Sequence, residues 1–506
     1  MNFLLALMLG AASAFAFQPF ALGPLMVLAF AALCELVTRA PSLRRALLIG
    51  WGFGVGQYCV GLNWIATAFT YQHAMPAWLG WVAVVLLSLY LAVYPMIAVG
   101  LAWRFGRGRR VALVLALSGG WAISEWLRAT MFTGFAWNPA GAVLVDTPLM
   151  RASGAVGTYG LSAVVVLIGG ALWLAAKREA KALAAIAAGI VLVALVPMPK
   201  IAARSVIRPV RIVQPNIGQQ DKWREGFDRV AADRLASLSI AGRPVSEMVF
   251  WPEAAVTDPL EDGRAGSEAF VTDQRLQATR TLGSNDLLLT GGLSYSARDR
   301  RTVDGATNSV FVLGPLGRVF GRYDKAHLVP YGEYLPMRPI LSAIGLSRLA
   351  PGDIDFTAGP GPRTITLPGN WGKVGFQICY EIIFSGDVVD RHNRPDFLFN
   401  PSNDAWFGRW GPPQHLAQAR LRAAEEGIPV IRSTPTGISA LVGADGSLMA
   451  ALPWRRAGTI RATLPAPAIG LTPFARFGNV IPLVLGFLLL FAAIALDPRR
   501  RYSATI

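Results

Sequence analysis

The chain has 506 residues, of which 53% are hydrophobic and only 15% are charged, and its net charge is +16. A soluble globular protein would have roughly 25% charged residues, so the composition argues against a wholly soluble protein. No recognisable nucleic-acid-binding module accompanies the basic residues, and we therefore expect no nucleic-acid partner.

Long apolar runs fill the first 197 residues, and another lies near the C-terminus. Runs of about 17–25 apolar residues can cross a bilayer as helices. The sequence predicts spans near 46–69, 77–102, 111–126, 157–176, 182–196 and 480–496, preceded by two shorter runs at 3–17 and 22–36. We therefore predict an α-helical membrane domain of about seven helices at 1–199, and a closing transmembrane helix with a basic tail at 476–506.

The basic residues orient these helices. Arginine and lysine are concentrated in the connections near 35–46, 103–110 and 177–181 and in the C-terminal tail, whereas the connections near 18–21 and 70–76 contain none. Basic connections stay on the cytoplasmic side of a membrane. We therefore expect both termini in the cytoplasm and residues 200–475 on the opposite side, which for a bacterial inner membrane is the periplasm.

Residues 200–475 have the composition of a soluble α/β domain, and they contain one cysteine, Cys379. A strand-like run at 374–378 precedes it, and strand ends are where α/β sheets place reactive groups. A cysteine nucleophile needs a nearby base or cation, because the thiolate is the attacking form. Taken alone, Cys379 fits a small buried hydrophobic residue equally well.

Two other strand-like runs end in groups that such a thiol needs. The run at 248–251 leads into Glu253, which is placed to act as a general base, although an isolated glutamate there would more simply be a solvated loop residue. Lys325 follows the second arm of a predicted hairpin in a segment rich in Tyr and Pro, where a lysine can stabilise an oxyanion. Glu333, in the same segment, can hold this lysine or orient a substrate.

In chain order, the motifs WPEAA around Glu253, YDKAHLVPYGEYLP around Lys325 and ICYE around Cys379 resemble the Glu-Lys-Cys triad of the nitrilase superfamily. Two further motifs, IVQPNIGQQDKW at 212–223 and FNPSNDAWFG at 399–408, make the chain most similar to the membrane branch of that superfamily, the apolipoprotein N-acyltransferases. The resemblance covers nearly the whole chain. It implies a nitrilase-like α-β-β-α sandwich at 200–475.

The resemblance also implies roles and a reaction. Cys379 would be the nucleophile, Glu253 the general base and Lys325 the oxyanion stabiliser, with supporting or substrate-binding roles for Glu333, Tyr380, Glu381 and Trp223. The implied enzyme moves an acyl chain from a phospholipid, typically phosphatidylethanolamine, through a thioester to the N-terminal amine of S-diacylglyceryl-cysteine apolipoproteins, completing lipoprotein maturation. The resemblance implies no cofactor, and the sequence has no metal motif such as HExxH.

Both substrates of that reaction are anchored in a bilayer, so the site would have to be reached from the membrane. The segment 131–150 is aromatic and rich in Pro and Gly, which is typical of the membrane interface. We expect it to support the substrate entrance, although an inert interfacial loop fits its composition equally well.

Two other functions are compatible with parts of this pattern. A membrane-bound amidase or nitrilase-type hydrolase would carry the same triad, although one helix would suffice to anchor it. A transporter with an exported binding domain would carry ionisable residues at mid-membrane depth, whereas Glu35 and Glu125 lie near the ends of predicted spans. The acyltransferase is therefore the function that we expect.

Overall fold

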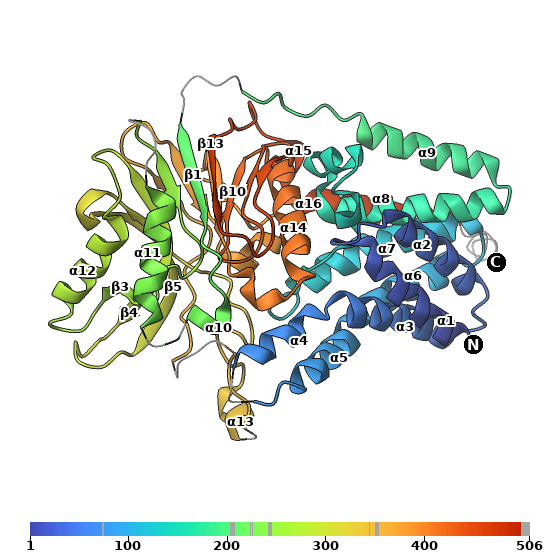
Figure 1. Cartoon of the computed structure of the whole chain (residues 1–506). Helices are drawn as coiled ribbons and strands as arrows, with labels where there is room; N and C mark the ends of the chain where they lie inside the picture. Colours follow the sequence, from blue (N-terminus) through green and yellow to red (C-terminus); the bar gives the residue numbers. More distant parts are fainter. Residues whose placement is uncertain are drawn as a thin grey trace.

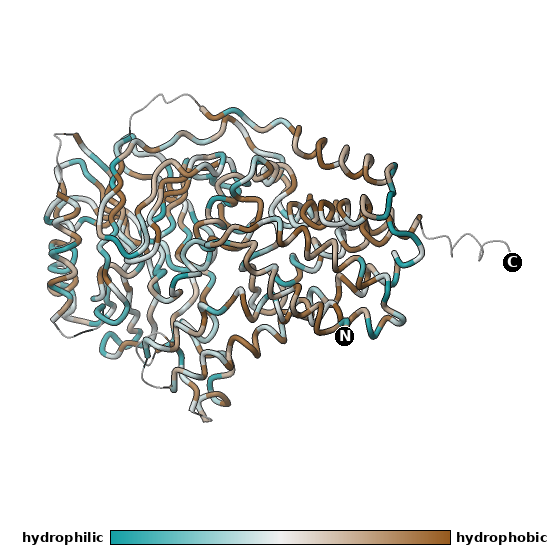
Figure 2. Tube along the Cα trace, turned by 45° about the vertical axis from the view of Figure 1, so that its right-hand side comes forward, coloured by the Kyte–Doolittle hydropathy of each residue, from teal (hydrophilic) through white to brown (hydrophobic). Residues whose placement is uncertain are grey.

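The computed structural model describes residues 1–72, 75–202, 208–222, 224, 226–240, 245–343, 345–349 and 354–496. A helical part and an α/β part lie side by side, and both the N-terminus and the last described helix belong to the helical part (Figure 1). Hydrophobic residues dominate the helical part, whereas the α/β part mixes hydrophobic and hydrophilic residues (Figure 2).

The helical part is built from the predicted apolar runs. Its helices are α1 (Asn2–Ser13), α2 (Gly23–Thr38), α3 (Leu43–Gly61), α4 (Trp64–Ala68), α5 (Leu79–Leu91), α6 (Val93–Gly106), α7 (Arg110–Thr130), α8 (Ser153–Ala176), α9 (Ala180–Ala194) and α16 (Val480–Ala495). Among the described residues, two helical stretches are long and apolar enough to cross a membrane, Leu79–Gly106 and Pro148–Ala176. A helical N-terminal region with two candidate spans is thus confirmed, and the larger number of spans stays a prediction, as do the segment boundaries at 199 and 475.

The run predicted as one span at 46–69 is instead two helices, α3 and α4. The break falls at Leu62 and Asn63, where the Asn63 side chain donates a hydrogen bond to the Val60 carbonyl at 2.7 Å. An asparagine amide competes in this way with the backbone ladder of a helix. Figure 1 shows the consequence, because α4 and α5 lie next to the α/β part.

Small residues allow the first helices to pack closely. A Cβ atom at Gly56 of α3 would lie 2.8 Å from the Ala11 amide nitrogen of α1, so only glycine fits at this crossing. In the core of the helical part, the rings of Phe30 and Phe53 are stacked, and both pack edge-to-face against Trp121. The helical part therefore has a fixed internal packing on which the other part can be positioned.

The basic connections lie together at one end of the helical part. Lys177, after α8, pairs with Glu35 of α2 at 2.9 Å, and Arg110, at the start of α7, pairs with Glu179 at 2.9 Å. The α/β part joins the opposite end of the helices (Figure 1). This arrangement agrees with the predicted orientation, which itself stays a prediction.

The α/β part contains two β-sheets. The first has the order β13-β1-β2-β4-β5-β6, with β3 also paired to β4, and the second has the order β12-β11-β10-β9-β8-β7. The strands β1, β2 and β4 are parallel, as are β8, β9 and β10. Their bounds are β1 (Pro209–Gln214), β2 (Met248–Phe250), β3 (Pro259–Asp262), β4 (Leu287–Ser296), β5 (Gly305–Leu313), β6 (Val319–Asp324), β7 (Thr364–Thr366), β8 (Lys373–Phe376), β9 (Phe397–Pro401), β10 (Val430–Ser433), β11 (Ala440–Val442), β12 (Leu448–Ala451) and β13 (Gly458–Thr463).

The two sheets face each other across an apolar core. Phe250 of the first sheet packs against Phe399 of the second, with ring centroids 5.0 Å apart. The alternate residue Val249 faces outward, toward α11 (Phe227–Ser239) and α12 (Glu268–Thr279). Leu398 faces outward from the second sheet toward α14 (Gly411–Glu426). The predicted α-β-β-α sandwich is confirmed; three short helices, α10 (Gln219–Lys222), α13 (Arg338–Ala343) and α15 (Pro473–Phe477), lie outside these layers.

The sandwich is fastened to the helical part through α14. Gly157, with φ 70°, breaks α8 and leaves the Thr158 amide without a helical partner, and the Glu425 carboxylate accepts this N–H at 2.6 Å. Arg422 of α14 contacts the same glutamate and also donates to the Ile383 carbonyl at 2.9 Å. These groups are buried, so their hydrogen bonds hold the sandwich in a fixed position against the helical part.

Candidate active site

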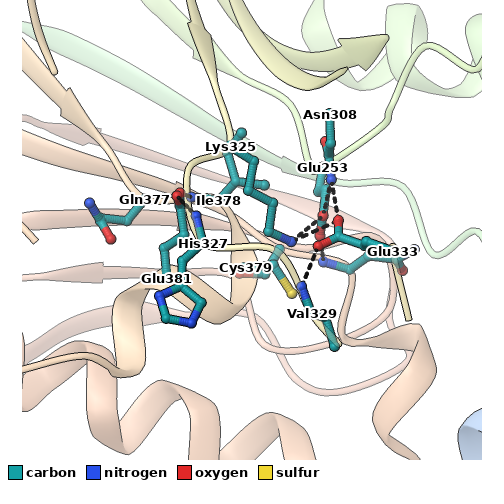
Figure 3. Close-up of polar contacts among 12 residues, drawn as sticks. Glu253, Asn308, Lys325, His327, Val329, Glu333, Gln377, Ile378, Cys379 and Glu381 are labelled. Atoms are coloured by element: carbon teal, nitrogen blue, oxygen red, sulfur yellow. Dashed lines mark hydrogen bonds and ion pairs between the residues drawn. The ribbon is translucent and has the colours of Figure 1, made fainter. Parts of the chain in front are cut away.

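The three predicted triad residues lie at strand ends and line one cavity. Glu253 follows β2, Lys325 directly follows β6, and Cys379 begins the 3-10 helix η6 (Cys379–Ile383) after β8. Figure 3 shows the Cys379 sulfur beside the side chains of Lys325, Glu253 and Glu333. The facing sheets thus bring together residues that are far apart in the chain.

Lys325 lies between two carboxylates. Its Nζ is 2.9 Å from Glu333 Oε1 and 3.5 Å from Glu253 Oε1 (Figure 3). The amide of Asn308 donates to both acids, at 2.7 Å to Glu253 and 3.0 Å to Glu333. Burial acts to lower the pKa of Lys325, but the Glu333 and Glu253 carboxylates outweigh it and raise that pKa. The lysine is therefore a buried, permanently charged donor.

Glu253 is fixed on its other side as well. Its Oε2 accepts a hydrogen bond from the backbone N–H of Asn403 at 2.7 Å. The next residue, Ala254, has φ 44°, and a Cβ atom at Gly291 of β4 would lie 2.7 Å from the Glu253 Cα. Only glycine permits this close approach of the two backbones. The carboxylate therefore has a defined direction into the cavity.

Cys379 has a strained backbone and a protonated side chain. Its φ of 51° is unusual for a non-glycine residue, and such strain is concentrated at functional sites. Burial and the nearby Glu253 carboxylate raise the pKa of the Cys379 thiol, and Lys325 opposes this shift. A thiol with a raised pKa needs a neighbouring group to take its proton before it can attack, and Glu253 lines the same cavity.

We expect the alkylation of Cys379 by iodoacetamide to keep accelerating between about pH 7 and about pH 10, because a thiol with a raised pKa is not yet fully ionised there. The rate is measured from the mass of the Cys379-containing peptide. A model cysteine peptide, with a pKa of about 8.5, should level off within this range. A plateau for Cys379 at a lower pH than for the model peptide would contradict the raised pKa.

Glu381 joins the loop of Lys325 to the loop of Cys379. Its Oε1 accepts hydrogen bonds from the Tyr323 hydroxyl at 2.8 Å and from the amides of Ala326 and His327 at 2.7 and 3.1 Å. Its Oε2 accepts from the Ile378 amide at 2.6 Å. The glutamate does not line the cavity, so its contacts position the loops of Lys325 and Cys379 rather than a substrate.

Tyr380 connects the loop of Cys379 to the helical part. It lines the cavity, and its hydroxyl donates to the Gly134 carbonyl at 3.2 Å. His327 Nε2 lies 2.7 Å from the neighbouring Thr133 carbonyl, and its ring stacks on Phe384 at 3.9 Å. The loops of Lys325 and Cys379 therefore pack against the segment after α7. Residue Trp223 lies outside the described residues.

The cavity is large and mainly apolar. Its volume is about 1160 Å³, above the range of roughly 300–1,000 Å³ typical of small-molecule sites. Both parts of the protein supply its wall, which includes Trp64, Phe69, Leu79, Val82, Leu86 and Tyr90 from α4 and α5 and their surroundings, residues 131–135, and Val329, Phe356, Trp406 and Phe407 from the sandwich. Of the segment 131–150, residues 131–135 line the cavity, as expected for a supporting element, and the remainder does not.

Several site residues were not singled out by sequence reasoning. Asn308 lies in the polar first half of β5, just before the apolar run at 310–313, and Asn403 lies inside the FNPSNDAWFG motif, so only Asn403 carried a usable signal. Lys222 lines the cavity, and its Nζ donates to the Glu253 carbonyl at 3.4 Å. Burial lowers the pKa of Lys222 to about 8, against the opposing effect of Glu253.

Comparison with known proteins follows the same division of the chain. The model of the apolipoprotein N-acyltransferase N-terminal domain matches residues 9–171, and that of carbon-nitrogen hydrolases matches residues 209–474. A Ralstonia nicotianae protein described as an apolipoprotein N-acyltransferase is 36% identical over 516 residues, covering 99% of this chain and 94% of that protein. The chain belongs to the apolipoprotein N-acyltransferase family. A relative with the same description from Brucella melitensis is 34% identical and covers 92% of this chain and 89% of its own length.

Among solved structures, Saccharomyces cerevisiae Nit3, a member of the nitrilase superfamily, is similar over 52% of this chain and 93% of its own, with 18% identity and a TM-score of 0.36. The two matched family models and the relatives from Ralstonia and Brucella confirm the resemblance to apolipoprotein N-acyltransferases at the level of the family. The N-terminal match covers α2 to most of α8, and the hydrolase match begins at β1 and ends in α15. In this member of the apolipoprotein N-acyltransferase family, the cavity is built from residues of both matched segments.

Proposed function

We propose that this protein transfers an acyl chain from a phospholipid to the N-terminal amine of diacylglyceryl apolipoproteins, through a thioester on Cys379, and so completes lipoprotein maturation. The observation that carries the proposal is the cavity, in which Glu253, Lys325 and Cys379 meet an apolar space whose wall is shared with membrane-type helices. The curated relatives are described as apolipoprotein N-acyltransferases, which supports the same reaction.

The first half-reaction forms the thioester. Glu253 takes the thiol proton as the Cys379 sulfur attacks the ester carbonyl of the phospholipid. Lys325 donates to the oxyanion of the tetrahedral intermediate, which a preorganised cation in a dry site stabilises strongly. The intermediate collapses, the carbon–oxygen bond of the ester breaks, and the leaving lysophospholipid takes the proton from Glu253. The acyl chain remains on sulfur.

The second half-reaction uses the same groups. The neutral amine of the diacylglyceryl cysteine attacks the thioester carbonyl, and Glu253 accepts the amine proton. An α-amino group has a pKa of about 8, so a useful fraction is neutral near pH 7. The carbon–sulfur bond breaks, Cys379 recovers a proton from Glu253, and an amide is released. The covalent intermediate divides one difficult acyl transfer into two easier steps.

The supporting residues act on these groups rather than on the chemistry itself. Glu333 Oε1 holds the Lys325 ammonium, and its Oε2 accepts the Val329 amide at 2.8 Å, so the cation cannot swing away from the cavity. Glu381 and Tyr380 fix the loop of the nucleophile. For Trp223 we keep the role that the family resemblance implies, a contact near the substrate.

We further propose that the protein is a multi-pass protein of the bacterial inner membrane with a periplasmic sandwich and both termini in the cytoplasm. The clustering of basic connections at the helical end away from the sandwich supports this orientation. Donor and acceptor lipids in the outer leaflet would then reach the cavity through the wall formed by α4 and α5.

The test follows a labelled acyl chain. Purified protein is incubated with a phospholipid that carries a labelled acyl chain and with a synthetic diacylglyceryl-cysteine peptide, and mass spectrometry locates the label. We expect the label to appear first on the fragment of the protein that contains Cys379 and then on the amine of the synthetic diacylglyceryl-cysteine peptide. A phospholipid with ether-linked chains, which has no acyl carbonyl, is the matched control and should leave Cys379 unlabelled.

Two outcomes would overturn the proposal. Label that reaches the peptide amine without appearing on Cys379 would exclude the thioester. Label released only as free fatty acid would make the protein a membrane-bound hydrolase of the amidase or nitrilase type, the principal alternative for this triad.

A further inference from the structure

A second set of charged residues lies directly beneath the nucleophile. His415, in the first turn of α14, has its Nε2 3.0 Å from the carbonyl oxygen of Cys379. Its Nδ1 is 3.0 Å from Asp404 Oδ1 and 3.0 Å from Arg432 Nη2. The side chains of His415, Asp404 and Arg432 have no measurable exposure, and we refer to these three residues as the buried cluster. The acyl-transfer mechanism above does not use them.

The contacts of His415 define the direction of its hydrogen bond. A carbonyl oxygen can only accept, so Nε2 carries the hydrogen and donates to Cys379. Nδ1 faces both a donor, Arg432 Nη2, and an acceptor, Asp404 Oδ1. The neutral ring accepts from Arg432 there, whereas the protonated ring donates to Asp404, and in both forms Nε2 is the donor to Cys379. Burial and Arg432 lower the pKa of His415, and this favours the neutral ring despite the opposing effect of Asp404. Arg432 also binds both oxygens of Asp404, each at 2.7 Å, and so compensates its charge.

This hydrogen bond acts on the strained part of the nucleophile loop. In a trans peptide the carbonyl and the following N–H point in opposite directions, so a partner for the Cys379 carbonyl also sets the direction of the Tyr380 N–H. A residue at φ 51° persists only when its surroundings determine its conformation. The carbonyl carbon is bonded to the Cα that carries the side chain, so holding this peptide plane also restricts the position of the Cβ to which the Cys379 sulfur is attached.

The buried cluster reaches the general base as well. Arg432 donates to Asn400 Oδ1 and, at 2.9 Å, to Ser402 Oγ, and so holds the loop that follows β9. In this loop the Asn403 amide donates to Glu253 Oε2 at 2.7 Å. Arg432 therefore links the loop of Asn403, whose backbone N–H donates to Glu253, with His415, which donates to Cys379.

We propose that His415 is a positioning residue for acyl transfer, which orients the Cys379–Tyr380 peptide through its Nε2 hydrogen while Asp404 and Arg432 fix its ring. The proposal deepens the proposed function and rests on it for the nature of the acyl donor. The alternative is that His415 only fills space, since its ring also lies against Trp137, with centroids 5.2 Å apart. A space-filling role would not depend on which ring nitrogen donates a hydrogen bond.

The test compares two amides that place a donor differently. In His415→Gln the side-chain amide nitrogen can reach the position of Nε2, whereas in His415→Asn it reaches only the position of Nδ1. We expect His415→Asn to slow thioester formation on Cys379 by at least about tenfold, since small misplacements at a reacting group have effects up to roughly 100-fold, and His415→Gln to stay within about threefold of the wild type. The KM for phospholipid should change little in either variant.

Gln414→Leu is the matched control. Gln414 is equally buried on the same turn, but its amide bonds with Trp137 and the Gln18 carbonyl instead of with the catalytic loops. Equal rates in the two His415 variants would overturn the proposal, as would a loss in Gln414→Leu that matches the loss in His415→Asn.

A second readout separates this proposal from the proposed function. The rate of iodoacetamide alkylation at Cys379 needs no lipid, and it should follow the same order, with His415→Asn slower than His415→Gln. If the wild type forms no thioester, the proposed function fails, while this order of alkylation rates still supports positioning by His415 and its absence still refutes it.

Discussion

Cys379→Ala is expected to form no acyl-enzyme and to transfer acyl chains on the order of 10⁴-fold more slowly, or worse, than the wild type, as is typical when a nucleophile is removed. The variant should fold normally, since alanine is smaller than cysteine and leaves no polar group of the site without its partner. It should therefore still bind phospholipid. The rate is measured as transfer of a labelled acyl chain to a diacylglyceryl-cysteine peptide, and binding is measured separately with a fluorescent phospholipid.

Two further variants test that the effect belongs to this sulfur. Cys379→Ser keeps a nucleophilic atom but offers a poorer leaving group, so an acyl chain that reaches the serine should stay there as an ester. Cys59→Ala is the matched control, because Cys59 lies in α3 and does not line the cavity, and this variant should retain wild-type activity. Substantial transfer by Cys379→Ala would contradict covalent catalysis at this position.

That Glu253, Lys325 and Cys379 are reactive candidates could be anticipated because each follows a strand-like run, and strand ends are where α/β sheets place their chemistry. Their meeting could not be derived in the same way, because Glu253 and Lys325 follow strands of the first sheet and Cys379 follows β8 of the second. Strand-like runs alone do not determine that the two sheets face each other; that expectation came from the family resemblance. The buried cluster around His415 could not be anticipated, since Asp404 begins a 3-10 helix after β9, His415 lies in α14 and Arg432 in β10, and the three meet only in the folded sandwich.

Glu381 shows a different limit. The motif ICYE identifies it as important, but a carboxylate next to a nucleophile can face the cavity or the protein interior. Its direction is set by four donors from Tyr323, Ala326, His327 and Ile378, and three of these come from the Lys325 segment. Local sequence therefore predicts the residue, whereas its role depends on a loop that is distant in the chain.

The part of the cavity wall that α4 supplies could not be predicted from the composition of its sequence. The run at 46–69 is mainly apolar, with Gln57 and Asn63 among the exceptions, and its average hydropathy gives no indication that α4 leaves the line of α3 to cover the sandwich. The break depends on Asn63 and its hydrogen bond to Val60, a local effect that a window average removes. Residues of α4 that read as part of a membrane span thus line the cavity.

Lys325→Met is expected to lower acyl transfer by about 10²- to 10³-fold, the usual effect of removing an oxyanion-stabilising donor. It should also reduce the free energy of unfolding by about 3 kcal/mol, because Glu253 and Glu333 would remain buried beside each other without their shared cation. Thioester formation on Cys379 measures the first effect, and denaturant unfolding followed by tryptophan fluorescence measures the second.

The double variant Lys325→Met/Glu333→Gln separates catalysis from stability. Removing one carboxylate relieves the repulsion, so we expect the double variant to recover at least about 1 kcal/mol of the stability lost by Lys325→Met, a coupling typical of residues in direct contact. Activity should not recover, because the oxyanion still has no cation. Glu333→Gln alone leaves Lys325 beside Glu253 and should be less impaired in acyl transfer than Lys325→Met. If the double variant regained activity together with stability, the role of Lys325 would be structural, and the oxyanion would have to be stabilised by another donor of the cavity.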